Sequence, residues 1–247
     1  MRCLIRLKSL KNQEYNPSYY VKLQGVLYNL LEETEYDDIH NLKPFKFICF
    51  SNIFPPKDMS KGDERTWIIS SPSQKLVEAL GEVISDKDKI ESGNQQYQVE
   101  SFDIFGLNPG EKGTMITGTP IIVRIPADEC EKYGIDSDGY DDVYWRLNHN
   151  PEAFLDKVEN NLASKYSNYY DREPPERPYF TGYEPRKQVS VPLEYSDGDV
   201  VVIGTTWKFH YECESREMRR LIRIGFSSGL GELNTTGFGF MNKVGDN

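Results

Sequence analysis

The feature that most constrains this chain lies near its C-terminus, where glycine recurs in a tight pattern. Residues 225–240 hold five of the chain's 19 glycines, among them the units Gly229-Leu230-Gly231 and Gly237-Phe238-Gly239. Glycine adopts positive φ angles without steric cost, so this segment can turn sharply and leave backbone N–H groups exposed. Such N–H groups can bind an anion. A plain glycine-rich hairpin between the last two strands explains the same spacing, and both interpretations stay open.

Two common phosphate-binding motifs do not fit this segment. A P-loop requires Lys and then Ser or Thr directly after its last glycine, whereas Glu232 follows Gly231. The dinucleotide fingerprint follows an early strand and opens a helix, with further units behind it. Here the glycines stand at the far end of the chain, so neither motif is predicted.

Charge is distributed unevenly along the chain. The formal net charge is -10, which argues against promiscuous binding of nucleic acids. However, residues 128–142 carry seven acidic groups and one lysine, whereas residues 216–225 carry four arginines and one glutamate. This segregation allows a local basic surface just ahead of the glycine-rich segment.

Other sequence features limit the class of protein. The four cysteines are scattered, with no CxxC motif and no histidine at metal-ligand spacing, so a zinc site or a disulfide framework is not expected. No apolar run approaches the length of a membrane span, and residues 1–8 alternate like a strand rather than a signal peptide. We therefore expect a cytoplasmic protein with reduced thiols and no membrane partner.

The apolar pattern of the first hundred residues predicts the order strand, helix, strand, strand, helix, strand. This order is typical of the split βαβ, or ferredoxin-like, arrangement. The strands are expected at residues 2–8, 45–54, 66–70 and 97–105, and the helices at residues 19–32 and 73–84.

A similar order follows residues 106–113, which form the best linker signal in the chain. We therefore predict an α+β protein with two tandem ferredoxin-like (RRM-like) domains, residues 1–112 and 113–247. Each domain is expected to be an antiparallel sheet with helices on one face. In the second half the strands are expected at residues 114–125, 186–193, 200–213 and after the glycine-rich segment, and the helices at residues 151–167 and 216–224.

Polar residues of the first half occur at a recognisable spacing. Tyr28 lies in the segment Gln24-Gly25-Val26-Leu27-Tyr28-Asn29, and His40 and Lys46 follow it. This spacing resembles the CRISPR-associated endoribonucleases that process precursor crRNA, the Cas family numbered six of the RAMP superfamily. The two glycine units are similar to the glycine-rich signature of that family. The segment Thr117-Gly118-Thr119-Pro120-Ile121 is similar to a strand that recurs there, so the resemblance covers essentially the whole chain.

The resemblance implies an RNA cleavage that needs no metal and no cofactor. The ribose 2′-OH attacks the adjacent phosphorus and leaves a 2′,3′-cyclic phosphate and a free 5′-OH. His40, with an unperturbed pKa of about 6.5, would take or give a proton. Lys46 would stabilise the charge on the phosphorane, and Tyr28 would orient or deprotonate the 2′-OH. The division of proton roles between Tyr28 and His40 stays open.

The resemblance also implies that CRISPR repeat RNA in precursor crRNA is the partner. Arginine pairs bidentately with phosphate and stacks on splayed bases. A CRISPR effector complex and a second copy of the chain are further candidate partners. The expected RNA contacts are Gly229, Gly231, Gly237, Gly239, Arg186, Lys187, Arg219, Arg220 and Arg223.

Each of these residues also has a structural interpretation. Tyr28 could complete the apolar stripe of its helix, and Lys46 could protect an edge strand against aggregation. The acidic residues between positions 32 and 38 would oppose RNA unless their side chains point away. The arginines of residues 216–225 could be paired with Glu212, Glu214 or Glu217.

Two other functions remain to be weighed against the nuclease. A noncatalytic RNA-binding RAMP subunit of a CRISPR effector would bind RNA tightly and cleave nothing. The presence of both His40 and Lys46, at the spacing seen in the enzymes, argues against this function. An unrelated RNA-recognition module would carry stacking aromatics in the RNP pattern, which the strands here lack.

Overall fold

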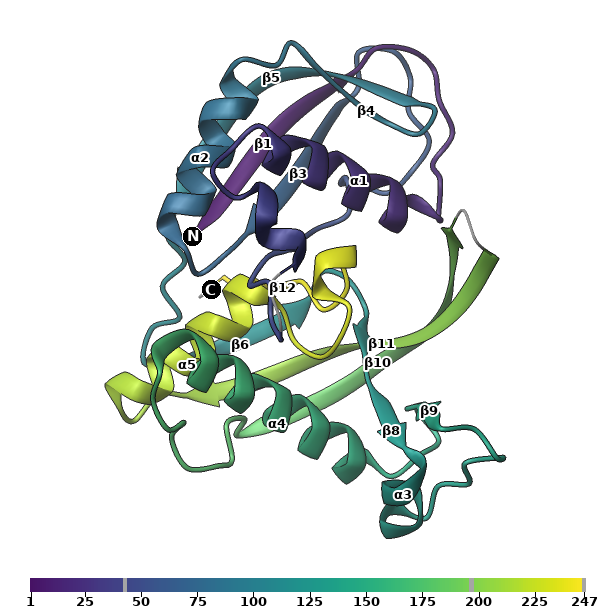
Figure 1. The fold of residues 1–247 in the computed structure, drawn as a ribbon, viewed down its shortest axis with the longest axis vertical. Coiled ribbons are helices and arrows are strands. Elements are labelled where there is room, and N and C mark those ends of the chain that lie inside the picture. The colour runs from purple at the N-terminus through teal and green to yellow at the C-terminus, as the bar shows by residue number, and fades with distance from the viewer. Residues whose placement is uncertain (42–43, 196–197, 246–247) are drawn as a thin grey trace.

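The computed structural model describes residues 1–41, 44–195 and 198–245, without the side chain of His40. It contains two antiparallel sheets that lie one above the other, each with helices packed on it (Figure 1). The strands of the first sheet come from residues 2–105 and those of the second from residues 112–243.

The first sheet has the strand order β2-β3-β1-β5-β4. Its central strand β1 alternates buried Cys3, Ile5 and Leu7 with more exposed residues, so one face of the sheet is covered by the helices α1 and α2 (Figure 1). The first four of these strands have the ferredoxin-like order, and β4 is an additional edge strand that forms a hairpin with β5. The elements are β1 (Arg2–Ser9), α1 (Tyr19–Glu32), β2 (Cys49–Phe50), β3 (Glu64–Ser70), α2 (Gln74–Ser85), β4 (Lys89–Ser92) and β5 (Gln95–Phe105).

The second sheet has the order β10-β11-β6-β12, and β7 pairs with β11. This is again the ferredoxin-like order, so the predicted tandem α+β fold is confirmed. A two-stranded sheet, β8-β9, and short helices extend from it. The elements are β6 (Lys112–Thr117), β7 (Ile121–Ile122), β8 (Arg124–Pro126), α3 (Ala127–Cys130), β9 (Asp142–Tyr144), α4 (Pro151–Tyr170), β10 (Gly182–Tyr195), β11 (Gly198–Glu212), α5 (Arg216–Ser228) and β12 (Met241–Lys243), with 3₁₀ turns η1 (Asp37–Asn41), η2 (Glu131–Tyr133) and η3 (Asn234–Thr236).

Local signals explain where three of the helices begin. The Ser73 hydroxyl accepts from the Leu76 N–H at 3.2 Å ahead of α2. The Ser215 hydroxyl caps α5 in the same way. Asn150 caps α4, and Pro151 occupies its first position, where a missing N–H has no consequence.

Two predicted strands are wrong in extent. Of residues 45–54 only Cys49–Phe50 joins the sheet, and Phe54 adds an isolated bridge to Thr66. Phe47 has a φ of +51°, which no extended strand accepts, so the chain before β2 leaves the sheet. The strand predicted at residues 114–125 is broken into three near Pro120, which lacks an N–H for the ladder.

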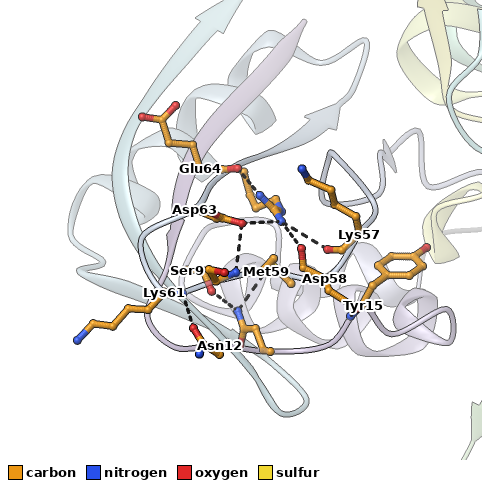
Figure 2. Close-up of polar contacts among 12 residues, drawn as sticks. Ser9, Asn12, Tyr15, Lys57, Asp58, Met59, Lys61, Asp63 and Glu64 are labelled. Carbon is orange, nitrogen blue, oxygen red and sulfur yellow. Dashed lines mark hydrogen bonds and ion pairs between the residues drawn. The ribbon is translucent and has the colours of Figure 1, made fainter.

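Polar contacts hold two loops together where β1 ends and β3 begins (Figure 2). The Tyr15 N–H donates to the Asp58 carboxylate at 2.9 Å, and the Lys61 N–H donates to the Asn12 amide oxygen at 2.9 Å (Figure 2). These loops belong to the first half alone.

The two halves share a buried interface. The guanidinium of Arg2 donates to the carbonyl oxygens of Phe226 and Met241 and lies 4.6 Å from the centroid of the Phe240 ring. The Phe238 ring stacks on Tyr20 of α1 at 4.2 Å. The glycine-rich segment of the second half thus packs into the core of the first.

The long hairpin of β10 and β11 adds a second connection. Its outer part rises beside the first half (Figure 1), and Val191, Leu193 and Val202 belong to the first core. At the same place Lys22 of α1 pairs with Glu194 at 3.2 Å. None of the helices in the described ranges is both long and apolar enough to cross a membrane.

Candidate functional site

The structure brings together two of the three residues predicted to be catalytic. The Lys46 Nζ donates to the Tyr28 hydroxyl at 3.4 Å and lies 5.7 Å from the centroid of its ring. Tyr28 lies at the margin of the apolar stripe of α1, where Leu27 and Leu31 are buried, and is itself half-buried. Its ring therefore packs on the core, as the structural interpretation expects, while its hydroxyl meets Lys46.

The third predicted residue, His40, lies in the 3₁₀ turn η1 between α1 and the segment that carries Lys46. Its side chain lies outside the described part of the structure. Ile39 is buried and anchors the turn beside α1. Of the neighbouring acidic residues, Glu33 is paired with Lys87 at 2.7 Å, which offsets part of the negative charge near the site.

Lys46 lines a pocket of about 320 Å³ between the two halves, called here the interdomain pocket. The segment 44–48 forms one wall, and the helix α4 and the glycine-rich segment form the others. Phe47, Asn161 and Lys165 also line it. The site is thus composite, because neither half encloses the pocket alone.

Lys165 is a functional candidate that sequence reasoning missed. Its side chain is only 2% exposed, and its Nζ donates to the carbonyl oxygens of Gly229 at 2.8 Å and Gly231 at 3.2 Å and to the Asn234 side chain at 2.6 Å. Burial lowers the pKa of Lys165 to about 7, while the Cys49 thiol and the Glu232 carboxylate act in the opposite direction. The lysine therefore holds the glycine-rich loop at one wall of the pocket.

A signal for Lys165 was present in the sequence. Val158, Leu162 and Tyr166 form the buried stripe of α4, and position 165 lies seven residues after Val158 and three after Leu162. These spacings place it on the same helix face. A lysine on a buried stripe requires hydrogen-bond partners, so its position indicates an internal role.

The four predicted glycines are all buried. The N–H groups of Gly229, Gly237 and Gly239 donate to carbonyl oxygens within the protein. A Cβ at Gly237 would lie 2.5 Å from the Phe50 ring of the first half. Gly229, which lies against Cys49, and Gly237 thus allow close packing between the halves, and the N–H groups of Gly229, Gly237 and Gly239 are not exposed for an anion.

The segment is also not a plain hairpin. The Asn234 side-chain amide donates to the carbonyl oxygens of Leu230 at 3.1 Å and Phe238 at 3.0 Å, which closes the loop on itself. Gly231 lines the interdomain pocket together with the polar residues Glu232, Asn234 and Thr235 of this segment.

The predicted basic residues lie on two separate elements. Arg186 and Lys187 are exposed on the edge strand β10, at a register irregularity after Pro185. Three others lie on α5 and, with Arg216 and linker residues 106–109, line a second pocket of about 400 Å³, called here the α5 pocket: Arg219, Arg220 and Arg223.

The α5 arginines have few carboxylate partners, so most of their positive charge is not neutralised within the described ranges. Arg219 lies 3.8 Å from Glu111, which is exposed. Arg223 donates to the Tyr170 hydroxyl at 3.2 Å, and Arg220 lies 5.6 Å from the centroid of the same ring. Within the described ranges the carboxylate paired with an α5 arginine is thus Glu111, rather than the three glutamates considered from the sequence.

The other two histidines lie elsewhere. His149 Nδ1 accepts from the Arg146 N–H at 3.2 Å in a turn. His210 Nδ1 lies 3.0 Å from the Thr114 hydroxyl on the second sheet. Neither residue lines the interdomain pocket.

Comparisons with known proteins agree with this fold. The family model described as CRISPR associated protein Cas6, C-terminal, matches residues 107–243. The CRISPR-associated endoribonuclease Cas6 2 of Methanocaldococcus jannaschii is 32% identical over 229 residues, which cover 90% of each chain. A solved structure described as CRISPR associated protein Cas6 has a TM-score of 0.75 at 21% identity and covers 99% of both chains. Another, described as an RAMP protein binding different RNA substrates, has a TM-score of 0.70 at 22% identity and covers 99% of this chain and 100% of its own. The matched second half and the relative that spans nearly the whole chain show that this protein belongs to the Cas6 family.

Proposed function

We propose that the protein is a cytoplasmic endoribonuclease that cleaves CRISPR repeat RNA within precursor crRNA and passes the product to a CRISPR effector complex. The observation that carries this proposal is the contact between Lys46 and Tyr28 beside the interdomain pocket. The name of the Methanocaldococcus jannaschii relative describes it as a CRISPR-associated endoribonuclease. The catalytic residues then belong to a proposed domain of residues 1–112, and the glycine-rich loop to a second of residues 113–247.

The proposed reaction is a transesterification at phosphorus. The 2′-OH of one nucleotide attacks the adjacent phosphorus, the bond to the 5′ oxygen of the next nucleotide breaks, and a 2′,3′-cyclic phosphate and a 5′-OH result. The Lys46 ammonium supplies positive charge for the phosphorane. The Tyr28 hydroxyl accepts from Lys46 and is therefore held in one orientation, suited to positioning the 2′-OH. His40 takes or gives a proton at neutral pH.

The proposal is tested by incubating the protein with a repeat RNA in EDTA and determining the end groups of the products. We expect cleavage to continue without divalent ions and to leave a 2′,3′-cyclic phosphate and a 5′-OH. Cleavage that stops in EDTA, or products with a 3′-OH and a 5′-phosphate, would contradict the mechanism.

A noncatalytic RNA-binding RAMP subunit is the second candidate. It is favoured by the similarity in fold to the RAMP protein described as binding different RNA substrates. It predicts tight binding of repeat RNA with no product at any enzyme concentration. The same incubation separates the two functions.

The α5 arginines are proposed to bind RNA phosphates. Replacing Arg219, Arg220 and Arg223 together by alanine should weaken binding similarly for all sequences. It should also reduce the slope of log affinity against log salt by about 2, since each phosphate contact on a single strand contributes about 0.7. Fluorescence anisotropy titrations at several salt concentrations measure both quantities.

Arg146→Ala is the matched control, because Arg146 is exposed in a turn that does not line the α5 pocket. The control should keep the affinity and the slope of the original protein. An unchanged slope in the triple variant would show that RNA does not contact α5.

A further inference from the structure

We propose that the interdomain pocket holds one unpaired nucleotide next to the scissile phosphate, with its base recognised by Asn161. This inference rests on the proposed function and adds to it a site that selects the base. A pocket of about 320 Å³ is at the small end of the range for ligand sites. It therefore suits one nucleotide better than a longer segment.

The first observation is an unsatisfied acceptor. The Asn161 Oδ1 is buried and has no hydrogen-bond partner among the described residues, and Asn161 lines the pocket. An unpaired buried acceptor costs about 1–3 kcal/mol. A bound group that donates a hydrogen bond would remove that cost.

The second observation is a pair of aromatic side chains in the same pocket. Phe45 and Phe47 flank Lys46 in the sequence, and all three line the pocket. Their rings lie 5.8 Å apart, and Phe47 also contacts Tyr169 edge-on at 5.2 Å. Both phenylalanines are half-buried, so they can offer a ring to a base. Proteins that recognise single-stranded RNA hold splayed bases on such rings.

The third observation is the distribution of charge. Arg124 is paired with Glu232 at 2.7 Å and with Asp142 at 3.2 Å, and the buried Lys165 already has three oxygen acceptors. Most of the lining is thus neutralised and suits an uncharged base. Lys46 is more exposed than Lys165 and reaches Tyr28, so it is the group that would meet the phosphate.

The acceptor predicts which bases fit. Adenine and cytosine carry an amino group at the position where guanine and uracil carry a carbonyl oxygen. In a pose that turns this position toward Asn161, the amino group of adenine or cytosine donates to Oδ1, whereas guanine or uracil bound in the same pose would place a carbonyl oxygen there as a second acceptor. Adenine offers the larger ring system for stacking and is the expected base.

The test uses repeat RNAs that differ only at the nucleotides on either side of the cleavage site. At one of these positions we expect adenine to be preferred over guanine by about 10-fold, or about 1.4 kcal/mol. The preference is measured twice, as kcat/KM for cleavage and as the dissociation constant. The binding measurement gives a result even for a protein that does not cleave.

Asn161→Leu should abolish the preference and cleave both RNAs at similar rates. Because the variant removes an unsatisfied buried acceptor, it should melt at the same temperature as the original protein or higher, which separates lost recognition from lost folding. Asn168→Ala is the matched control, since Asn168 lies on the same helix, is exposed and contacts its own helix at Ser164. It should keep the preference.

The outcomes for this site and for the proposed function are distinct. Equal affinity and equal cleavage for all flanking bases, or a preference that survives in Asn161→Leu, would overturn the nucleotide site and leave the nuclease intact. A base preference in binding without any cleavage would support the site and overturn the nuclease.

Discussion

Replacing Lys46 by alanine is expected to slow cleavage of a repeat RNA by about 10²–10³-fold, because loss of one group that stabilises the transition-state charge has an effect of that size. The other cations of the pocket cannot take its place. Arg124 is paired with two carboxylates, and Lys165 is buried with three oxygen acceptors. Affinity for the RNA should change much less, since one charge contributes little to a long phosphate track.

The rate is measured in a single turnover with enzyme in excess, so that it reports the chemical step. Lys61→Ala is the matched control, because Lys61 is an exposed lysine in the loop before β3 (Figure 2).

The His40→Ala variant should cleave the RNA about 10²–10⁴-fold more slowly, as expected for the loss of a single proton-transfer group. An RNA with 2′-deoxyribose at the scissile nucleotide should bind but resist cleavage. A Lys46→Ala variant that cleaves at the original rate would remove Lys46 from the mechanism.

Gly239→Ala is expected to destabilise the protein by about 2–5 kcal/mol. Gly239 has a φ of +69°, and a Cβ there would overlap the carbonyl oxygen of Leu230. The left-handed backbone contributes about 1–2 kcal/mol for a residue with a side chain, and the overlap contributes about 1–3 kcal/mol more. The loop that Lys165 and Asn234 hold would shift, so cleavage should fall as well.

Thermal unfolding followed by circular dichroism measures this effect. A protein of this size should lose about 5–15 °C in melting temperature. Gly25→Ala is the control, because Gly25 lies in α1 with an ordinary φ and no atom within 4 Å of the added Cβ. Alanine in a helix should raise stability by up to about 1 kcal/mol. Equal melting temperatures for Gly239→Ala and the original protein would contradict the role assigned to this glycine.

The glycine-rich segment shows where sequence reasoning reached its limit. The pattern predicted positive φ angles correctly, since Gly229, Gly231, Gly237 and Gly239 all have them. It could not distinguish two uses of that backbone, exposure of N–H groups and close packing. The structure shows close packing at Gly237. The atoms nearest to it belong to the ring of Phe50, a residue that is distant in the chain.

Phe47 shows the same limit on a local scale. Alternating aromatic residues at positions 45 and 47 predict a strand, but the positive φ of Phe47 turns the chain out of the sheet. The ring of Phe47 contacts Tyr169 of α4, which lies in the other half of the molecule. Tertiary packing therefore overrode the local preference.

By itself the sequence determined the order of the strands and helices that make up the two ferredoxin-like units, the class of both halves and the basic character of α5, but it did not predict β4, α3 or β9. These predicted features follow from side-chain periodicity, because the spacing of apolar residues shows which face of a helix or strand is buried. Only the tertiary structure decided that Lys46 meets Tyr28, that Lys165 holds a loop more than sixty residues further along the chain, and that a pocket opens between the halves. Such contacts depend on how distant elements pack against one another, and local periodicity carries no information about that packing.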